Sequence, residues 1–257
     1  MFQSSHRGEL EFLHSADADI YLQGAHLTRF RDWLFLSDAS DFADGQAIRG
    51  GVPVIFPWFG PNKTDASAPS HGLVRAKIWQ VENVADDAVT LLTQADDWRV
   101  RMKFGFADEL RMRLEVENLT DLPFQFECAL HTYFAVDDAR SVVISGLDSK
   151  SYLDKTENYA RVMQSGDVTL RGETDRVYLD SCAPITIRDG ARTIRIAGSS
   201  GWRSTVVWNP WEKVGARMAD LSEWQRFVCV ECGAIADDAI TLAARASYAL
   251  DITVSVE

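Results

Sequence analysis

The segment ELRMRLEVEN, residues 109–118, is the most regular part of this 257-residue sequence. Apolar residues alternate along it with charged ones, and successive side chains of a β-strand point to opposite faces of a sheet. The pattern therefore predicts a strand with one buried face and one face in water, as strands of antiparallel sheets commonly have.

Similar short segments lie on both sides of this strand, with turn residues such as Asp86-Asp87 between them. They occupy residues 9–13, 19–23, 27–30, 77–81, 79–84, 88–93, 124–136, 142–144, 151–153, 176–179, 185–187, 193–196, 205–208, 227–231 and 247–256. Only Met218–Arg226 suggests a short helix. Many short strands with close turns predict an all-β, mostly antiparallel sandwich or barrel with few short helices.

No repeat, low-complexity stretch or linker divides the sequence, so a single domain over residues 1–257 is expected. Hydrophobic residues make up 46% of the chain, which is enough for a large core. The net charge of −12 argues against a general affinity for nucleic acid or acidic membranes, because the overall field repels polyanions. A small anionic ligand would need arginines concentrated at one place.

The cysteine content and the amino-terminal sequence indicate a cytoplasmic protein with reduced thiols. Four cysteines do not form a disulfide framework in a chain of this length: Cys128, Cys182, Cys229 and Cys232. The first residues lack a signal-like apolar core, and no apolar run reaches membrane-spanning length.

Residues 47–79, AIRGGVPVIFPWFGPNKTDASAPSHGLVRAKIW, concentrate glycine, proline, aromatic and basic residues. The pair Gly50-Gly51 permits unusual backbone angles and a close approach to a ligand, and the prolines fix the turns that follow. An irregular loop that leads into a strand and carries His71 and Arg75 is a candidate rim of a binding site. The alternative is a surface loop held down by buried aromatic side chains.

Two ionisable residues lie inside apolar strands. His131 exchanges protons near neutral pH more readily than other side chains, although a histidine in such a strand is more often structural. Glu231 shares one strand face with apolar neighbours, where desolvation raises a carboxyl pKa into the range of a general base. The alternative for Glu231 is a glutamate at a strand end that faces water.

Other motifs narrow the chemistry. Cys229 and Cys232 have the CxxC spacing, but on a strand their thiols point to opposite faces and no further ligands complete a metal site. Arg49 and Arg75 bracket the loop at residues 47–79, and the guanidinium fork suits phosphate or carboxylate, although both could be ordinary surface arginines. No GxGxxG, P-loop or GxSxG motif supports nucleotide use or serine hydrolysis.

Several motifs together resemble the hexose-6-phosphate mutarotases (glucose-6-phosphate 1-epimerases) of the aldose 1-epimerase superfamily. They are IRGGVP at 48–53, PWFG at 57–60, HGLVR at 71–75, LHTYF at 130–134, VWNPW at 207–211, MAD at 218–220 and FVCVE at 227–231. The resemblance implies a large antiparallel β-sandwich of the galactose-mutarotase type, with a ligand cleft on one face.

The same resemblance implies roles for individual residues. His131 would be the general acid and Glu231 the general base, and Arg49 and Arg75 would bind the phosphate or the sugar close to it. Asp175 matches a further sugar-binding aspartate. At the HG pair, His71 would bind a hydroxyl, and Ser70 would be a further substrate-binding residue at the position where relatives often have Gln.

The implied activity is interconversion of the α and β anomers of an aldohexose 6-phosphate by ring opening and reclosure. This reaction needs no metal, nucleotide or other cofactor, and the protein is expected to be a monomer whose partner is a small sugar phosphate. Two alternatives stay open: a mutarotase of unphosphorylated aldoses, and a non-catalytic carbohydrate-binding sandwich that stacks sugars on Trp58 and Trp208.

Overall fold

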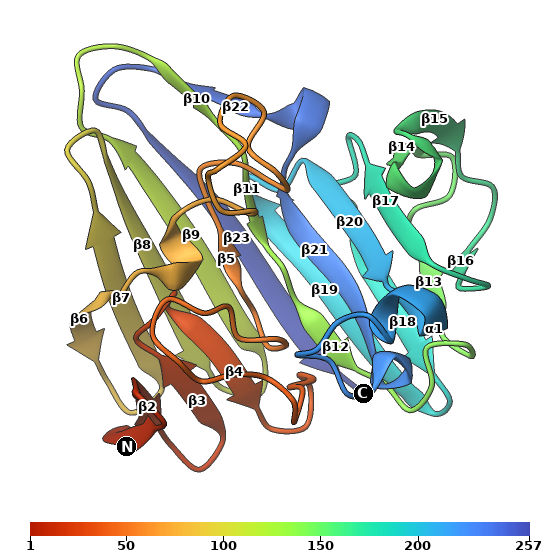
Figure 1. Cartoon of the computed structure of the whole chain (residues 1–257), viewed down its shortest axis with the longest axis horizontal. Coiled ribbons are helices and arrows are strands. Elements are labelled where there is room, and N and C mark those ends of the chain that lie inside the picture. Colours follow the sequence, from red (N-terminus) through yellow and green to blue (C-terminus); the bar gives the residue numbers. More distant parts are fainter.

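Two large antiparallel sheets make up most of the computed structural model, which describes residues 1–257 (Figure 1). One has nine strands in the order β16-β13-β18-β19-β23-β9-β8-β7-β6. The other has eight, in the order β15-β14-β17-β20-β21-β11-β5, with β12 also paired to β21. The prediction of an all-β antiparallel sandwich with few short helices is confirmed.

The nine-stranded sheet contains the segment with the regular alternation at its centre. Its strands are β6 (Gln80–Val84), β7 (Ala88–Gln94), β8 (Trp98–Phe106), β9 (Leu110–Asn118), β13 (Val143–Ser145), β16 (Val168–Thr169), β18 (Ile185–Asp189), β19 (Arg192–Ser200) and β23 (Ser247–Val256). Every second residue of β9 is buried and the residues between are partly or fully exposed, as the sequence predicts.

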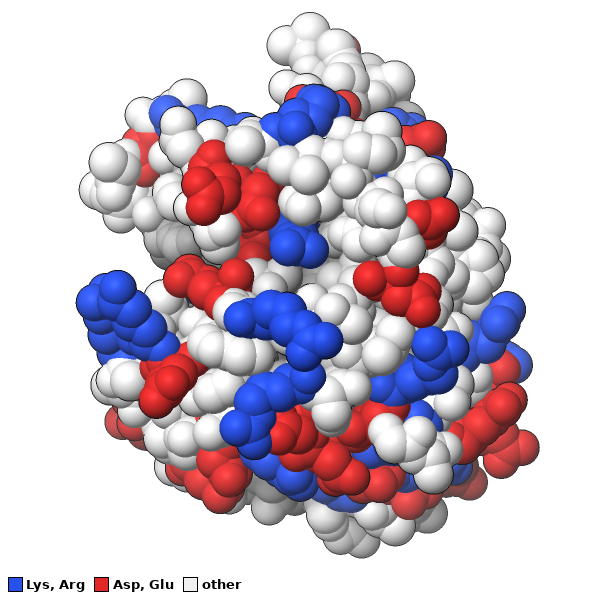
Figure 2. Space-filling model, turned by 90° about the vertical axis from the view of Figure 1, so that its right-hand side faces the viewer, with Lys and Arg blue, Asp and Glu red and all other residues white.

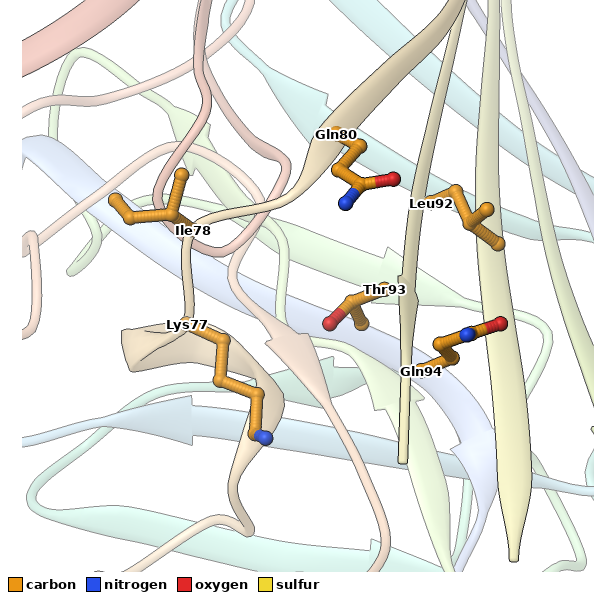
Figure 3. A pocket seen from close by; sticks show the side chains of 6 residues that line it. All are labelled: Lys77, Ile78, Gln80, Leu92, Thr93 and Gln94. Carbon is orange, nitrogen blue, oxygen red and sulfur yellow. The ribbon is translucent and has the colours of Figure 1, made fainter. Parts of the chain in front are cut away.

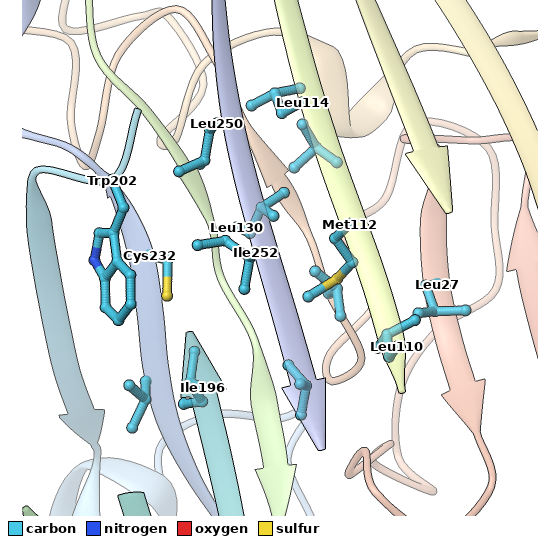
Figure 4. Close-up of a cluster of buried hydrophobic side chains, with 14 of the residues drawn as sticks. Leu27, Leu110, Met112, Leu114, Leu130, Ile196, Trp202, Cys232, Leu250 and Ile252 are labelled. Carbon is cyan, nitrogen blue, oxygen red and sulfur yellow. The ribbon is translucent and has the colours of Figure 1, made fainter. Parts of the chain in front are cut away.

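Apolar side chains from the two sheets meet in one core. Leu114 of β9 lies opposite Met102 of β8 and Leu250 of β23. Figure 4 shows these strands facing Leu130 and Cys232 of the other sheet. Burying one such leucine contributes about 1.5–3 kcal/mol, so the alternating pattern holds the two layers together.

The eight-stranded sheet carries the candidate site. Its strands are β5 (Val54–Ile55), β11 (Cys128–Leu130), β12 (Tyr133–Ala135), β14 (Ser151–Asp154), β15 (Ala160–Met163), β17 (Thr174–Tyr178), β20 (Ser204–Asn209) and β21 (Phe227–Ala234). Every residue of β21 is buried, because this strand is covered on both faces and paired on both edges.

The remaining elements are short. A four-stranded sheet contains β1 (Gln3–Arg7), β2 (Leu10–His14), β3 (Ala18–Tyr21) and β4 (His26–Phe30), and β10 (Phe124–Phe126) pairs with β22 (Ile240–Leu242). The helices are α1 (Trp211–Gly215) and the 3-10 turns η1 (Val74–Ala76), η2 (Lys155–Glu157), η3 (Trp224–Arg226) and η4 (Ala236–Asp238). None of these helices has the length and apolar character needed to span a membrane.

The helix predicted at Met218–Arg226 is wrong. Its first six residues form a short turn and irregular backbone, and only its last three residues form η3. Its polar groups bond to distant parts of the chain: Asp220 accepts from Arg49, and the backbone N–H of Ser222 donates to Ser37 Oγ. These tertiary bonds replace the helical ones that the local pattern suggested.

The strand predicted over Phe124–Val136 is broken into β10, β11 and β12. At the second break the backbone N–H of Thr132 bonds back to the carbonyl of Leu130 at 2.9 Å. This tight turn removes His131 from the regular strand ladder. The break therefore changes the direction of the chain at the histidine that the sequence analysis singled out.

Other strands also differ from the prediction. The strand expected at residues 77–81 begins at Gln80, because the indole N–H of Trp79 donates to the carbonyl of Val74 at 3.0 Å and holds η1 before it. The short strands β1, β5, β15, β16 and β22 are not among the predicted strands. Strand β8 is also missing from the prediction, although WRVRMKFGF alternates nearly as regularly as β9. Its burial alternates in the same way as far as Phe104.

The glycines of residues 47–79 permit close backbone crossings. Gly51 has a φ of 61°, and a Cβ placed there would lie 2.3 Å from the carbonyl oxygen of Leu27. Gly72 has a φ of 78°, and its Cβ would lie 2.1 Å from the carbonyl oxygen of Phe56. Any side chain would push these segments apart, so glycine is required where the loop crosses the four-stranded sheet and β5.

Candidate active site

A cavity of about 140 Å³ opens on the eight-stranded sheet and contains the densest group of ionisable side chains with perturbed pKa values. It is lined by Arg49, Phe59, His71, His131, Lys155, Asp175, Trp208 and Glu231. Five residues proposed from the sequence therefore share one cavity. Of the other two, Ser70 is exposed and Arg75 is half-buried, and neither lines it.

His131 and Glu231 form the centre of the site. His131 Nε2 lies 3.3 Å from Glu231 Oε1, and the side chains are 10% and 1% exposed. His131 Nδ1 and Glu231 Oε2 are buried without any hydrogen-bond partner. An unsatisfied buried polar atom costs about 1–3 kcal/mol, so these two atoms indicate where a ligand would complete the hydrogen bonding.

The position of Glu231 follows from the alternation of β21. Phe227 and Cys229 pack in a small cluster on the same side of the strand as Glu231, whereas Val230 and Cys232 belong to the main core. The predicted division of this strand into two faces is confirmed. A carboxylate thus lies on a fully buried strand, beside aromatic side chains.

Burial raises the pKa of Glu231 well above its ordinary value. The neighbouring carboxylate of Asp175 raises it further, while the ammonium group of Lys155 acts in the opposite direction. Because desolvation dominates, this carboxyl accepts a proton far more readily than an exposed glutamate does.

The ring of His131 is held between aromatic groups. It stacks on Tyr133 with ring centroids 4.9 Å apart and meets the edge of Trp208 at 5.8 Å. Burial, followed by neighbouring His71 and the arginines at the site, lowers the pKa of His131 well below its ordinary value. Burial therefore favours the uncharged form of both members of the central pair.

Arg49 is fixed by other parts of the fold. Its Nε and Nη2 donate to Asp220 Oδ2 at 3.0 and 2.8 Å, and its Nη1 donates to the hydroxyl of Tyr133 at 3.0 Å. These bonds restrain the guanidinium at the wall of the cavity. The turn that replaces the predicted helix thus supplies the carboxylate that holds Arg49.

Arg75 differs from Arg49 because its side chain forms no hydrogen bond and no ion pair. It follows His71 by four residues and lies in η1. Burial and the charge of Arg49 lower the pKa of Arg75, so the two guanidinium groups lie within electrostatic reach of each other. A half-buried arginine without a partner has N–H groups free to donate hydrogen bonds to an anion.

His71 is held by the backbone of Gly60. Its backbone N–H donates to the carbonyl of Gly60 at 2.8 Å, and its Nδ1 accepts from the N–H of Gly60 at 3.2 Å. Burial, with the nearby cations Arg75 and Lys155, lowers the pKa of His71 to about 3. Because Nδ1 accepts, the neutral ring carries its proton on Nε2 and can donate it to a ligand oxygen.

Asp175 and Lys155 form an ion pair in the lining of the cavity. Lys155 Nζ lies 2.7 Å from Asp175 Oδ2, and Asp175 Oδ1 is buried without a partner. Burial raises the pKa of Asp175. Lys155 was missed in the sequence analysis, because no local motif marks it: its role depends on the pairing of β14 with β17, which brings η2 beside Asp175.

The two tryptophans considered for sugar stacking have different environments. Trp208 lines the cavity. The indole of Trp58 donates to the carbonyl of Pro69 at 3.1 Å and ties its own loop together, and Trp58 is not part of the cavity lining.

A larger cavity, of about 410 Å³, lies between β6, β7 and the segment before β6 (Figure 3). It is lined by Lys77, Ile78, Gln80, Leu92, Thr93 and Gln94. Lysine is the only ionisable side chain in this lining, so it offers no pair for proton transfer. We therefore identify the smaller cavity around His131 and Glu231 as the candidate active site, because of its ionisable side chains and not because of its volume.

The side of the molecule that carries β14 and β15 shows no large field of one sign. Figure 2 shows lysine and arginine side chains interspersed with aspartate and glutamate on this side. Binding of a small anion therefore depends on individual cations such as Arg75, rather than on a basic surface.

Comparison with known proteins shows one consistent relationship. The family model described as aldose 1-epimerase matches residues 9–255. A protein of Escherichia coli named "Putative glucose-6-phosphate 1-epimerase" is 35% identical over 232 residues, covering 83% of this chain and 78% of that protein. A protein of Cenchrus ciliaris with the same name is 30% identical over 249 residues, covering 85% of this chain and 75% of that protein.

A solved structure shares the fold over nearly the whole chain. The crystal structure of a "putative mutarotase" from Salmonella typhimurium superposes with a TM-score of 0.91 at 29% identity, covering 99% of this chain and 93% of that one. The expected galactose-mutarotase-like architecture is thereby confirmed.

Proposed function

The chain belongs to the aldose 1-epimerase family and is an isomerase, and from this premise we propose that it interconverts the α and β anomers of aldohexose 6-phosphates, glucose 6-phosphate in particular. The observation that carries the choice of a phosphorylated sugar is the unpaired guanidinium of Arg75 beside the cavity of His131 and Glu231. The names of the E. coli and Cenchrus relatives agree with this choice.

Arg75 supplies the first phosphate contact in this proposal. Its planar fork is free to form two parallel hydrogen bonds to phosphate oxygens. Arg49, which Asp220 and Tyr133 hold in place, adds a second positive charge without having to be reoriented. With a net charge of −12, the protein depends on such local cations to attract an anion.

Glu231 and His131 carry out the proton transfers. The Glu231 carboxylate removes the proton of the anomeric hydroxyl, the bond between C1 and the ring oxygen breaks, and protonated His131 gives its proton to the ring oxygen. Rotation about the C1–C2 bond then presents the other face of the aldehyde. Acid–base assistance of this kind contributes about 10²–10⁴-fold in rate.

The two residues act as a unit that holds one proton. Ring opening leaves the proton on Glu231, and ring closure on the other face returns the pair to its starting state. In the free protein, burial favours protonated Glu231 beside neutral His131. A bound phosphate dianion offsets the arginines that lower the pKa of His131, and so favours the charged form that donates to the ring oxygen.

Two further groups orient the sugar. Asp175 Oδ1, which has no protein partner, accepts a hydrogen bond from a sugar hydroxyl. The Nε2–H of His71 donates to another oxygen. Lys155 holds Asp175 and favours the carboxylate form of Glu231. A hydroxyl at each site would satisfy polar atoms that the fold leaves unpaired.

The test is anomer exchange measured by NMR on glucose 6-phosphate, with free glucose and galactose in parallel. Exchange accelerated for glucose 6-phosphate alone is the expected result. Acceleration of the free sugars instead would assign the protein to mutarotases of unphosphorylated aldoses. If no sugar or sugar phosphate exchanges faster than in buffer, yet sugars still bind, the protein is a carbohydrate-binding module and the proposal fails.

A further inference from the structure

Cys229 lies beside the central pair but takes no part in the proposed reaction. It precedes Glu231 by two residues on β21 and faces the same side, while Tyr133 of β12 pairs with it across the sheet. Ligand atoms of Cys229, His131 and Glu231 all lie within 4.8 Å of one another, and all three residues are buried. The alternation of β21 places Cys229 and Glu231 on one face, and the pairing of β12 with β21 brings His131 beside them.

The spacing of these atoms matches that of zinc ligands. With bonds of about 2.0–2.2 Å, nitrogen and oxygen ligands of a tetrahedral zinc ion lie about 3.4 Å apart. His131 Nε2 and Glu231 Oε1 lie 3.3 Å apart. A thiolate at about 2.3 Å from the ion would lie about 3.6 Å from each of the others. Cys229 needs to move by only about 1 Å from the 4.8 Å limit to reach that position.

The chemistry of the three groups is that of a zinc ligand set. A thiolate, an imidazole and a carboxylate together suit zinc, whereas Mg²⁺ and Ca²⁺ prefer oxygen ligands alone. One thiolate and one carboxylate balance a divalent charge, so the ion and its ligands form a neutral unit in a buried place. His131 Nδ1 and Glu231 Oε2 have no partner in the fold, so neither residue is tied to a competing hydrogen bond through those atoms.

The cavity gives an ion access to these ligands. His131 and Glu231 line it, and Cys229 is fully buried and is not among the lining residues. An ion bound by the three would occupy the floor of the cavity with its fourth position toward the opening. Three protein ligands with a fourth position left for water or another small ligand is an established arrangement of zinc sites in enzymes.

We propose that His131, Cys229 and Glu231 form a binding site for zinc or a similar soft divalent ion, and that the bound ion blocks anomer exchange. As the bonds to the ion form, the thiol proton of Cys229 and the carboxyl proton of Glu231 both leave to solvent, and no group changes oxidation state. The ion takes the lone pairs of His131 and Glu231 that proton transfer requires. Inhibition therefore rests on the proposed function, whereas binding of the ion does not.

The test uses Co²⁺ as a coloured substitute for zinc. The full chain carrying Cys182→Ser, which removes the exposed thiol, is freed of metal with a chelator and titrated with Co²⁺. We expect one equivalent to bind and to give a thiolate-to-cobalt charge-transfer band in the near ultraviolet, which Zn²⁺ then abolishes. Zinc should also suppress exchange of glucose 6-phosphate, and a chelator should restore it.

Matched variants assign the thiol. Cys229→Ala should lose the charge-transfer band and bind zinc at least about tenfold more weakly, since a ligand is lost. Cys232→Ala is the control, because Cys232 is also buried on β21 but points into the main core, and it should keep the band. If Cys229→Ala does not fold, persistence of the band in both Cys128→Ala and Cys232→Ala assigns it to Cys229, because these are the other buried thiols and Cys182 is absent.

The outcomes separate the two proposals. Absence of the charge-transfer band in the Cys182→Ser protein, or its persistence when Cys229→Ala is added, would overturn the metal site even if the protein proves to be an epimerase. The band without any epimerase activity would leave the metal site standing and defeat the proposed function. Binding of zinc without inhibition of an active enzyme would refute the claim that the ion blocks exchange.

Discussion

The outer face of the nine-stranded sheet and the cavity of the eight-stranded sheet use the same charged residue types in opposite ways. On the outer face, charges are partly exposed and paired across strands: Arg99 lies 2.8 Å from Glu117, and Lys103 lies 2.9 Å from Glu115. In the cavity, Glu231 Oε2 and Asp175 Oδ1 are buried and have no partner.

This difference separates groups that the fold satisfies from groups that it leaves for a ligand. A paired charge at the surface contributes about 0–1 kcal/mol to stability and keeps the sheet face in water. A buried unpaired group costs stability, so its presence in a native protein calls for a functional reason. Buried groups whose partner lies within the fold itself, such as His26, form a third class. Substitutions of the unpaired cavity groups should therefore affect anomer exchange, that of His26 the pH dependence of stability, and those of the paired surface charges only the free energy of unfolding.

The largest effect is expected for Glu231→Gln. Exchange of glucose 6-phosphate should fall by about 10²–10⁴-fold, because the amide cannot accept the proton of the anomeric hydroxyl. The variant should unfold at the same temperature as the parent or higher, since it removes a buried ionisable carboxyl group whose Oε2 has no partner and replaces it with an amide of similar size. NMR exchange and thermal unfolding on one sample check both. A rate close to that of the parent would contradict the assigned base.

The sequence predicts those parts of the fold where one strand face is wet. Segments such as 109–118 alternate because one side of the sheet meets solvent, and the structure has β9 there. The pattern fails where tertiary contacts override it. Asp220 is drawn to Arg49, which prevents the predicted helix, and a tight turn at Thr132 interrupts the predicted strand.

The residues of the candidate site likewise differ in whether the sequence or only the tertiary structure reveals them. His131 and Arg49 belong to distinctive motifs, so the sequence alone is enough to name them. Lys155 cannot be named in this way, because its partner Asp175 is brought near only by the pairing of two strands. The proximity of Cys229 to His131 likewise depends on the pairing of β12 with β21. No periodicity or spacing in a single sequence encodes that pairing.

The second effect is the pH dependence of stability caused by His26, a buried group with a partner in the fold. Its Nε2 lies 2.7 Å from the carbonyl oxygen of Gly50, and burial lowers its pKa from 6.5 to about 4. Between these values the unfolded state binds more protons than the native state. The contribution of His26 to the free energy of unfolding is therefore fully present above pH 6.5 and is lost as the pH drops toward 4. The loss is roughly 3 kcal/mol in all and about 2 kcal/mol by pH 5.

Urea unfolding at pH 7.5 and pH 5 of the parent and of His26→Gln checks this prediction. The variant should lose about 2 kcal/mol less over that interval, because glutamine does not titrate. His71 and His131 remain in both proteins, so the difference isolates His26. An equal loss in parent and variant would show that His26 is protonated without cost in the native state.

The third effect concerns the anion. Arg75→Met should raise the KM for glucose 6-phosphate by roughly 10–100-fold, the equivalent of one or two charge-assisted hydrogen bonds. Stability should change little, because Arg75 has no partner in the fold to lose. Arg111→Met, an exposed arginine of β9, is the control and should leave KM unchanged. If Arg75→Met binds glucose 6-phosphate as well as the parent does, the phosphate lies elsewhere.

The smallest effect is expected on the outer face of the nine-stranded sheet. Arg99→Gln breaks the pair with Glu117, whose side chains are 29% and 35% exposed. The free energy of unfolding should fall by about 0.2–1 kcal/mol, and less in high salt, because water and ions screen partly exposed charges. Anomer exchange should not change. A loss well above 1 kcal/mol that persists in high salt would show that the fold also requires the pairing of charges on this outer face. The outer face and the cavity would then differ because the charged groups of the cavity lack partners, and not because they are more deeply buried.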